Sequence, residues 1–548
     1  MKRASEAQIR RTAEPSLSPI GTLSNVAEYH VENFGCRASR ADGEAIAANL
    51  RQSGLLPADA PASASVVIVN TCSVTAEADR QARAYLRRVR RQNPNAKVIV
   101  TGCYAQRSPQ ELAALPEVDA VIGNSHKSMV ADVARDLANG NSAVIVISSV
   151  ILSEPSEFVA PDFGRNNQFR RESNGPAVVS LSTEHAKLSF IPLTKILHDD
   201  AFAHSSLATL PFAPDSRQTR PNLKVQDGCG NRCSFCIIPT TRGPSRSIPL
   251  ETCLDNVHRF VDNDGKELVL SGINLGRWGR DLQPTQRFED LVAAILNKTT
   301  LPRLRLSSIE PMDWSPDLLA LYREHSTGDQ TRVPHVPAVG TWDPQQPSAT
   351  LHPRLARHTH LPLQSGSDTI LRRMYRRYRP WHYAERLAQI RALLPDAAIG
   401  ADVMIGFPGE TDALFQESYD FIGARPFTYL HLFPFSARPT TPAWELHRQY
   451  PVPTRAVHER MAALRDLIAE KSRAFRTQFL GRTLSAITLG PDSKEPGPDG
   501  STQAVTDNFL KLTLASETGE PIPANTLVTA NITALTDEGL RGNLVSVS

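Results

Sequence analysis

Three cysteines stand close together near the middle of the chain, with a spacing that suits an iron-sulfur cluster. They lie within residues 227–239, with three and then two residues between successive thiols: Cys229, Cys233 and Cys236. A [4Fe-4S] cube has four irons, and cysteine thiolates normally hold all of them. Three thiolates would leave one iron open, where a small chelating molecule could bind and accept an electron. The run therefore predicts a redox cluster loop with one open position.

Three more cysteines lie far upstream, each at the end of an apolar or small-residue run. They are Cys36 after Phe34-Gly35, Cys72 after residues 66–71 and Cys103 after residues 98–102. Each run is typical of a strand that leads into a loop. Because open α/β sheets bring their functional groups to the carboxyl ends of the strands, three such thiols would converge at one edge. We predict a second [4Fe-4S] cluster there, again with an open iron.

Zinc binding, or a purely structural role, is the alternative for the central cysteines. Zinc prefers four nitrogen or sulfur ligands, often as matched pairs. The nearest downstream candidates, Cys253 and His258, are five residues apart on a predicted helix and would not share a face. Cys253 instead follows helical spacing with Leu250, Val257 and Phe260, so we expect it in the core.

Strand-like and helical runs alternate along most of the chain and predict an α/β protein. Residues 28–150 should form a parallel sheet flanked by helices. Residues 220–450 should form an open (β/α)6 partial barrel, with the cluster loop after its first strand, where barrels carry their chemistry. The six strand candidates of this partial barrel are residues 223–226, 267–270, 304–307, 360–363, 399–405 and 429–434.

The remaining segments are predicted to be extensions, connectors and a small terminal domain. Residues 481–548 have short alternating strands and should form a small β-barrel, joined to the partial barrel by a helical connector over residues 451–480. Residues 1–27 read as a flexible extension. Residues 151–219 read as a linker or insertion, and residues 324–353 as a segment that loops out.

The composition agrees with a multidomain protein, and the net charge by itself neither indicates nor excludes a nucleic-acid partner. The chain has 548 residues, 41% of them hydrophobic, and 60 Lys+Arg against 57 Asp+Glu give a net charge of only +3. Any binding of nucleic acid must therefore depend on local patches. The amino terminus lacks an apolar signal region, and the longest apolar stretch is too short to span a bilayer. We expect no membrane association and a cytoplasmic location, where cysteines serve as metal ligands more readily than as disulfides.

The two cysteine triads and several longer segments resemble the methylthiotransferase family of radical S-adenosylmethionine (SAM) enzymes, which modify transfer RNA or a ribosomal protein. The resemblance covers most of the chain. The matching segments are residues 33–39, 70–75, 101–106, 229–236, 268–274, 305–311, 360–368, 402–410 and 431–436.

The resemblance implies two [4Fe-4S] clusters and SAM as cofactors. It places Phe235, just before the last cysteine of the loop, and several polar residues at strand ends as candidate SAM contacts. These strand-end residues are Ser271, Gly272, Ser308, Glu310, Gln364 and Asp402. One SAM would methylate a sulfur on the upstream cluster, and a second would yield the 5′-deoxyadenosyl radical that removes hydrogen from the target carbon.

Within the family, the loop sequences at residues 35–39, 236–247 and 270–276 look most like the branch that acts on N6-threonylcarbamoyladenosine (t6A) at position 37, next to the anticodon. The expected reaction adds a methylthio group to C2 and converts t6A to ms2t6A. The alternatives within the family are isopentenyladenosine in tRNA and an aspartate of a ribosomal protein. An alternative from another class is a non-catalytic iron-sulfur protein that binds RNA or transfers electrons. The expected partners are the tRNA anticodon loop, an electron donor such as flavodoxin or ferredoxin, and a sulfur source.

Two arginine-rich stretches are candidate RNA contacts. The first stretch follows Cys72 on a predicted helix, and the second interleaves arginine with tyrosine. The candidate residues are Arg87, Arg88, Arg90 and Arg91 in the first stretch, and Arg372, Arg373, Tyr375 and Arg376 in the second. The alternative for each stretch is an ordinary solvated face. The terminal barrel resembles the RNA-binding module called TRAM, although from Arg476 onward it carries five basic and eight acidic residues, the wrong sign for binding phosphate.

Overall fold

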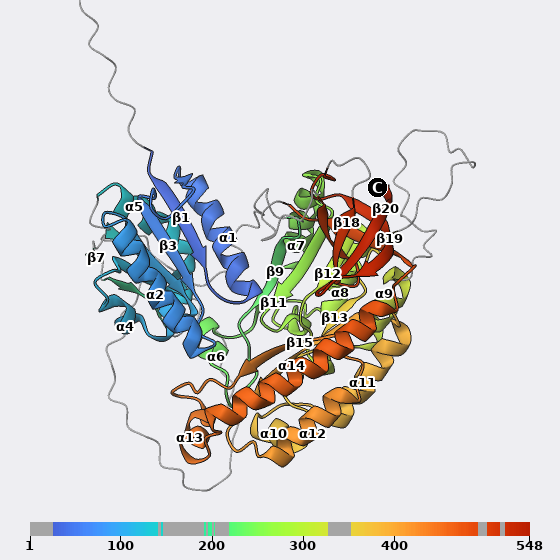
Figure 1. The fold of residues 1–548 in the computed structure, drawn as a ribbon. Coiled ribbons are helices and arrows are strands. Elements are labelled where there is room, and N and C mark those ends of the chain that lie inside the picture. The colour runs from blue at the N-terminus through green and yellow to red at the C-terminus, as the bar shows by residue number, and fades with distance from the viewer. Residues whose placement is uncertain are drawn as a thin grey trace, which may run out of the picture.

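A computed structural model shows two parallel α/β bodies and a small barrel (Figure 1). It describes residues 26–140, 144–145, 191–192, 195–199, 202, 219–326, 352–490, 501–515 and 521–547. Most of the predicted amino-terminal extension, of the predicted linker and of the segment predicted to loop out lies outside these residues. Among the described residues, no helix is long and apolar enough to cross a membrane.

The first body is a six-stranded sheet in the order β2-β1-β3-β4-β5-β8, and every neighbouring pair is parallel. Its strands are β1 (Glu28–Asn33), β2 (Leu56–Pro57), β3 (Val66–Thr71), β4 (Lys97–Gly102), β5 (Ala120–Gly123) and β8 (Ile196–Leu197). The edge strand β8 belongs to the segment that the sequence suggested was a linker. A separate antiparallel pair is formed by β6 (Val144–Ile145) and β7 (Ile191–Pro192).

Helices cover both faces of this sheet, because the alternating side chains of β3 are apolar in both directions. Val67 and Val69 pack with residues of α2, whereas Val66 and Ile68 pack with residues of α1 and α5. The helical segments are α1 (Arg37–Gln52), α2 (Ala76–Gln92), α3 (Cys103–Arg107), α4 (Pro109–Ala113), η1 (Asn124–Met129) and α5 (Val130–Ala138). A strand that is buried on both faces is typical of a parallel sheet.

The second body contains six parallel strands, as expected for a partial barrel. The strands are β9 (Asn222–Asp227), β11 (Glu267–Gly272), β12 (Arg303–Leu306), β13 (His358–His360), β14 (Ala398–Ile405) and β15 (Tyr429–Pro434), with β10 (Arg246–Ser247) antiparallel to β9. Residues 354–356, just before β13, bond to Leu304 of β12 and connect the two halves. The predicted α/β fold class is confirmed, although β13 ends where the expected strand 360–363 begins.

Helices surround these strands and supply most of the core. The helical segments are α6 (Ile238–Arg242), α7 (Leu250–Asp262), η2 (Leu275–Arg277), α8 (Phe288–Lys298), η3 (Pro311–Asp313), α9 (Pro316–Ser326), α10 (Asp368–Arg373), α11 (Pro380–Leu393), α12 (Asp412–Gly423), α13 (Pro442–Gln449) and α14 (Thr454–Thr477). Cys253 of α7 is fully buried in this core, which confirms its expected structural position.

The predicted terminal barrel is also confirmed: five strands close in the order β16-β17-β18-β20-β19. They are β16 (Thr483–Thr488), β17 (Thr502–Thr506), β18 (Lys511–Ala515), β19 (Leu527–Leu535) and β20 (Leu540–Val547). Arg305 in β12 donates to the backbone carbonyls of Thr506 and Asp507, and Arg357 forms an ion pair with Asp507 at 2.6 Å. Arg303, which also contacts the barrel, is the first residue of β12, so the barrel packs toward the amino ends of the core strands.

A buried ion network joins the first body to the second. Asp42 of α1 pairs with Lys127 of η1, Lys224 of β9 and Arg242 of α6. Asp227 provides a second carboxylate for Lys224 and Arg242, at 2.9 Å from each. All five residues are buried. Because removing one partner of such a network leaves an uncompensated buried charge, the network fixes how the two bodies meet.

Candidate functional site: two cysteine triads around one cavity

The central triad lies in the loop between β9 and α6, where its sulfur atoms accept several hydrogen bonds from N–H groups. Cys229 Sγ accepts from the Asn231 backbone at 3.4 Å and from Asn274 Nδ2 at 3.6 Å. Cys236 Sγ accepts from the Ile238 backbone at 3.5 Å. These donors favour the negative charge of a thiolate, the form that binds metal.

The side chain that approaches the remaining cysteine of this loop comes from a distant segment. Arg376 Nη1 lies 3.3 Å from Cys233 Sγ, and the same guanidinium binds Glu310 at 2.6 Å. None of the three loop cysteines forms a disulfide. Three free thiols, with N–H donors directed at their sulfurs, fit the predicted cluster loop.

The upstream triad is assembled by neighbouring strands. Cys36 follows β1 and caps α1, Cys72 follows β3, and Cys103 follows β4 as the first residue of α3. Since β1, β3 and β4 are adjacent in the sheet, their carboxyl ends bring the three thiols to one edge. This arrangement is the one that the parallel sheet was expected to produce.

Two glycines allow the strand ends to approach so closely. Gly35 has φ +110°, and a Cβ added there would lie 2.8 Å from Cys72 Sγ. Gly102 has φ +96°, and its Cβ would lie 2.6 Å from the Thr71 backbone nitrogen. Both positions need a residue without a side chain, because of the positive φ and of the contact.

Burial favours the protonated form of two of these thiols, Cys72 and Cys236, by raising the pKa of each. Burial raises the pKa of Cys72 to about 12, and the neighbouring Cys103 and Cys36 contribute to the rise. Burial likewise raises the pKa of Cys236 to about 12. Metal binding requires deprotonated thiols, so a positively charged centre must offset this desolvation. The donor chemistry of both triads fits an iron-sulfur cluster.

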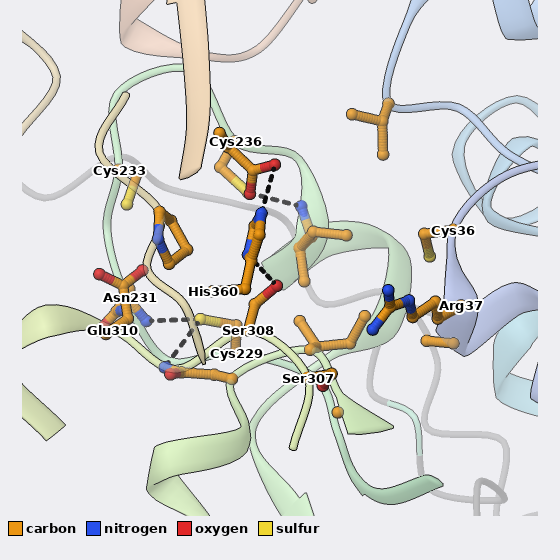
Figure 2. A pocket seen from close by; sticks show the side chains of 18 of the residues that line it. Cys36, Arg37, Cys229, Asn231, Cys233, Cys236, Ser307, Ser308, Glu310 and His360 are labelled. Atoms are coloured by element: carbon orange, nitrogen blue, oxygen red, sulfur yellow. Dashed lines mark hydrogen bonds and ion pairs between the residues drawn. The ribbon is translucent and has the colours of Figure 1, made fainter. Parts of the chain in front are cut away.

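The central triad and Cys36 of the upstream triad line one cavity of about 560 Å³ (Figure 2). Cys36 lines it from the first body, and the central triad lines it from the second. All seven residues expected to contact SAM also line it: Phe235, Ser271, Gly272, Ser308, Glu310, Gln364 and Asp402. Cys72 and Cys103 lie behind this surface and are buried. The structure therefore gathers these predicted residues from distant parts of the chain into one space.

Several polar atoms around the cavity have no partner among the described residues. Ser271 Oγ, Asn274 Oδ1 and Gln364 Oε1 are buried and accept or donate no hydrogen bond there. Gln364 also has φ +66°, and its backbone N–H bonds to the Asp402 carbonyl at 2.7 Å. Buried polar groups are normally satisfied. A polar small molecule with amino, carboxylate and hydroxyl groups, such as SAM, fits these unpaired atoms.

His360 and His431 were not assigned a role from the sequence, although both begin segments that resemble the family. His360 Nε2 lies 3.5 Å and His431 Nδ1 lies 3.3 Å from the Asp402 carboxylate. The second ring nitrogen of His360 pairs with Ser308 Oγ at 2.7 Å, as Figure 2 shows. The two histidines therefore orient the side chains of Asp402 and Ser308 on the wall of the cavity.

Asn124 and Arg242 are further residues that sequence reasoning missed. Asn124 Nδ2 donates to the Thr241 carbonyl at 2.7 Å and lies 3.5 Å from Cys103 Sγ. Arg242 belongs to the buried ion network and also bonds to Ser39 Oγ. Asn124 lies in no segment that resembles the family, whereas Arg242 lies within residues 236–247, a segment used above only to choose the branch. Only the packing of the first body against α6 brings them to the upstream triad.

The arginine stretches are less uniform than the sequence suggested. In α2, Arg87, Arg88 and Arg91 are exposed, whereas Arg90 forms an ion pair with Asp119 and donates to three backbone carbonyls. The guanidinium of Arg90 is therefore already occupied by internal contacts, and it is a poor candidate for binding RNA.

The second stretch needs a similar correction. Arg372, Arg373 and Tyr375 are exposed, but Arg376 is buried and its guanidinium binds Glu310 and Cys233. Arg376 therefore belongs to the cavity wall, and the expectation that it contacts RNA does not fit its position. Arg377, the residue after Arg376, is exposed.

Comparisons with known proteins agree with this site. Residues 28–123 match a family model described as "Uncharacterized protein family UPF0004". The threonylcarbamoyladenosine tRNA methylthiotransferase MtaB of Bacillus subtilis is 30% identical over 487 residues, which cover 87% of this chain and 88% of that protein. MtaB of Aquifex aeolicus is also 30% identical, over 84% of this chain and 92% of that protein.

A second kind of relative is similar to nearly the same extent. The tRNA-2-methylthio-N(6)-dimethylallyladenosine synthase of a Parafrankia species is 29% identical, over 86% of this chain and 80% of that protein. The extent and identity of these matches, together with the two triads at one cavity, show that the chain belongs to the radical SAM methylthiotransferase family.

Proposed function

We propose that this protein adds a methylthio group to C2 of t6A at position 37 of tRNA and so forms ms2t6A. The enzyme class follows from the family, since its matched relatives are named as tRNA methylthiotransferases. The choice of t6A is supported by the MtaB relatives, five of which match at 27–30% identity. The loop residues after Cys36 and Cys236 support the same branch.

The observation that carries the proposal is the shared cavity. Methylthio transfer needs a sulfur site and a SAM site close to one substrate carbon. Cys36 of one triad and all three cysteines of the other line the same space of about 560 Å³. An iron-sulfur protein that only transferred electrons or bound RNA would not need a cavity lined by the central triad, by Cys36 of the upstream triad and by unpaired polar atoms.

We propose that the two cysteine triads have different roles. We assign Cys229, Cys233 and Cys236 to the cluster that binds SAM, and Cys36, Cys72 and Cys103 to the cluster that carries sulfur. When bound and reduced, the first cluster supplies the electron that cleaves SAM. Ser271, Gln364 and Asn274 offer free polar oxygens to the SAM molecule.

Other residues of the chain hold these groups in place. Glu310 neutralises Arg376 next to Cys233, and Ser308 is fixed by His360. The substrate base would enter between these residues and Cys36. Phe235, which packs against Phe407 with ring centroids 6.5 Å apart, gives the loop an apolar support.

We also propose how the larger segments are used. Residues 28–150 carry the sulfur site, residues 220–450 the SAM site, and residues 481–548, beyond the connector 451–480, a TRAM-like RNA-binding barrel. The exposed arginines of α2 and α10 are proposed contacts for the anticodon stem and loop. A protein such as flavodoxin or ferredoxin would supply electrons, and a separate source would replace the transferred sulfur.

Nucleoside analysis of tRNA tests the proposal directly. Mass spectrometry of tRNA from a deletion strain should show loss of ms2t6A and accumulation of t6A, and the gene should restore the product. Loss of the methylthio derivative of isopentenyladenosine instead would move the protein to the other tRNA branch. Unchanged tRNA nucleosides, together with an unmodified ribosomal-protein aspartate, would identify the ribosomal protein as the substrate.

A further inference from the structure

Arg37 places a guanidinium on the cavity wall directly beside the sulfur site. It is the first residue of α1, follows Cys36 in sequence and lines the cavity. Figure 2 shows its side chain extending from the side of Cys36 toward the side where Ser308 and His360 lie. Among the residues that the structure describes, none forms an ion pair or hydrogen bond with it.

The other cationic groups of the cavity already have partners. Arg376 is held by Glu310, at 2.6 Å. His360 and His431 share the carboxylate of Asp402. Arg37 interacts electrostatically with Asp402 without forming an ion pair. The carboxylate of Asp402 is already shared by the two histidines. The guanidinium of Arg37 therefore borders the space where a substrate would lie and has no hydrogen-bond or ion-pair partner among the described residues.

A guanidinium with free donors is a receptor for a carboxylate or a phosphate, which it can bind through two parallel hydrogen bonds. Three sources could provide such an anion here: the threonyl carboxylate of t6A, the methionyl carboxylate of SAM, or a tRNA phosphate. Arg37 lies on the wall opposite the strand ends expected to hold SAM, on the side where the sulfur must meet the substrate base. This placement favours the substituent on the base.

We propose that Arg37 binds the threonyl carboxylate of t6A and thereby determines specificity for t6A over isopentenyladenosine. The inference rests on the proposed function and deepens it. Isopentenyladenosine carries an uncharged hydrocarbon at the same nitrogen, which would displace water from the guanidinium without pairing with it. A t6A nucleoside offers a carboxylate that can take the place of that water.

The test compares binding of two tRNAs that differ only at position 37. Full-length reconstituted protein is titrated with tRNA that carries t6A and with the same tRNA that carries unmodified adenosine. The Arg37→Gln variant should lose about tenfold to a hundredfold in affinity for the t6A form, the range expected for a charged hydrogen bond, and little for the unmodified form. Arg37→Lys keeps the positive charge but lacks the planar guanidinium. Its affinity for the t6A form should therefore lie between those of the wild type and Arg37→Gln.

Arg40→Gln provides the matched control. Arg40 lies three residues further along the same helix, is exposed and pairs with Glu44. It does not line the cavity. This variant should keep the wild-type preference for t6A. Iron content is measured for each variant, so that damage to the neighbouring cluster site is recognised.

Three outcomes would overturn the inference. An equal loss of affinity for both tRNAs in Arg37→Gln would mean that Arg37 binds a phosphate. A raised Kd for SAM in the absence of tRNA would assign Arg37 to the SAM carboxylate. An unchanged preference for t6A would show that Arg37 does not touch the substituent. If wild-type protein forms no ms2t6A, the proposed function itself fails, which the nucleoside analysis detects separately.

Discussion

The two cysteine triads lie beside the same cavity, but the chain assembles them in different ways. The central triad lies within eight residues of one loop, from Cys229 to Cys236. The upstream triad spans residues 36 to 103 and exists only because β1, β3 and β4 are neighbours in a parallel sheet. The central site is thus a local property of the chain, whereas the upstream site is a property of the fold. The geometry of the upstream site should therefore depend more strongly than that of the central site on residues that do not contact a sulfur atom.

Single cysteine substitutions should give the largest effect and separate the two sites. Cys233→Ala should abolish production of 5′-deoxyadenosine from SAM, because the two remaining thiolates cannot secure the SAM-binding cube. Cys72→Ala should retain SAM cleavage but lose methylthio transfer. Anaerobically reconstituted protein should contain about eight irons, two cubes of four, and each variant about four.

Cys253→Ala is the matched control for these variants. Its thiol is fully buried in the core of the second body, so the substitution should leave the iron content and SAM cleavage in place. A content of about four irons in the wild-type protein, or bound zinc, would contradict the two-cluster interpretation.

Removing the central carboxylate of the buried ion network should perturb the upstream site from a distance. Asp42→Asn would remove the carboxylate that pairs with Lys127 and would leave Lys224 and Arg242 with only Asp227 in this network. Breaking a buried ion network in this way costs about 3 to 5 kcal/mol of stability. Chemical unfolding under anaerobic conditions measures the loss.

Asp412→Asn serves as the comparison. Its side chain is 98% exposed although it pairs with Arg460, and exposed carboxylates contribute at most about 1 kcal/mol. If Asp42→Asn proves no more destabilising than Asp412→Asn, the network does not fix how the two bodies meet. We also expect Asp42→Asn to weaken retention of the upstream cluster more than that of the central one, as iron content after mild unfolding would show.

Acid should weaken two buried ion networks, the one around Asp42 that joins the two bodies and the one around Glu267 within the second body. Burial alone would raise the pKa of Asp42, but the cations led by Lys127 outweigh it and lower the pKa to about 2. Burial is similarly outweighed at Glu267, where Arg305, Arg220 and Arg303 lower the pKa to about 2. A carboxylate with a lowered folded pKa stabilises the protein above its unfolded pKa and loses that contribution as pH falls through the folded value.

The free energy of unfolding should therefore decrease between about pH 4.5 and pH 2, by roughly 2 to 3 kcal/mol for each carboxylate. The Asp42→Asn and Glu267→Gln double variant should lack most of this decrease. If its pH profile parallels that of the wild type across this range, other carboxylates dominate the acid sensitivity.

Substitution of the exposed arginines should give the smallest effect and distinguish the two bodies as RNA-binding surfaces. Changing Arg87, Arg88 and Arg91 to Gln removes up to three phosphate contacts from the first body. The slope of log affinity for tRNA against log salt should then flatten by about 0.7 to 0.9 per lost contact. The equivalent change of Arg372, Arg373 and Arg377 tests the second body.

An unchanged slope in either variant would mean that the stretch is only a solvated face. Deleting the barrel is a poor test of its RNA contact, because Arg305 and Arg357 lose their buried partners when Thr506 and Asp507 are removed. Arg541→Gln, at an exposed position of β20, is a milder probe. Because the barrel is acidic overall, this variant should alter the slope less than either arginine triple.

The central triad could be identified from sequence because a loop of eight residues fixes its own geometry. The upstream thiols could be predicted to converge because parallel strands leave their carboxyl ends at one edge, and the glycines at residues 35 and 102 mark the tight approach. Boundaries were less accurate. Strand β13 begins two residues before its expected start at residue 360.

The sequence by itself determined the two cysteine triads as candidate ligand sets, the α/β class and the terminal barrel, because local spacing and hydrophobic alternation encode them. Only the tertiary structure decided that Arg37 lines the cavity with free donors, that Arg376 belongs beside Cys233, and that Asp42 sits among three buried cations. Composition cannot distinguish an arginine on a solvated face from one in a cavity. That distinction depends on which groups the fold brings within reach of the guanidinium, because a charge is stabilised by its neighbours in space rather than by its neighbours in sequence.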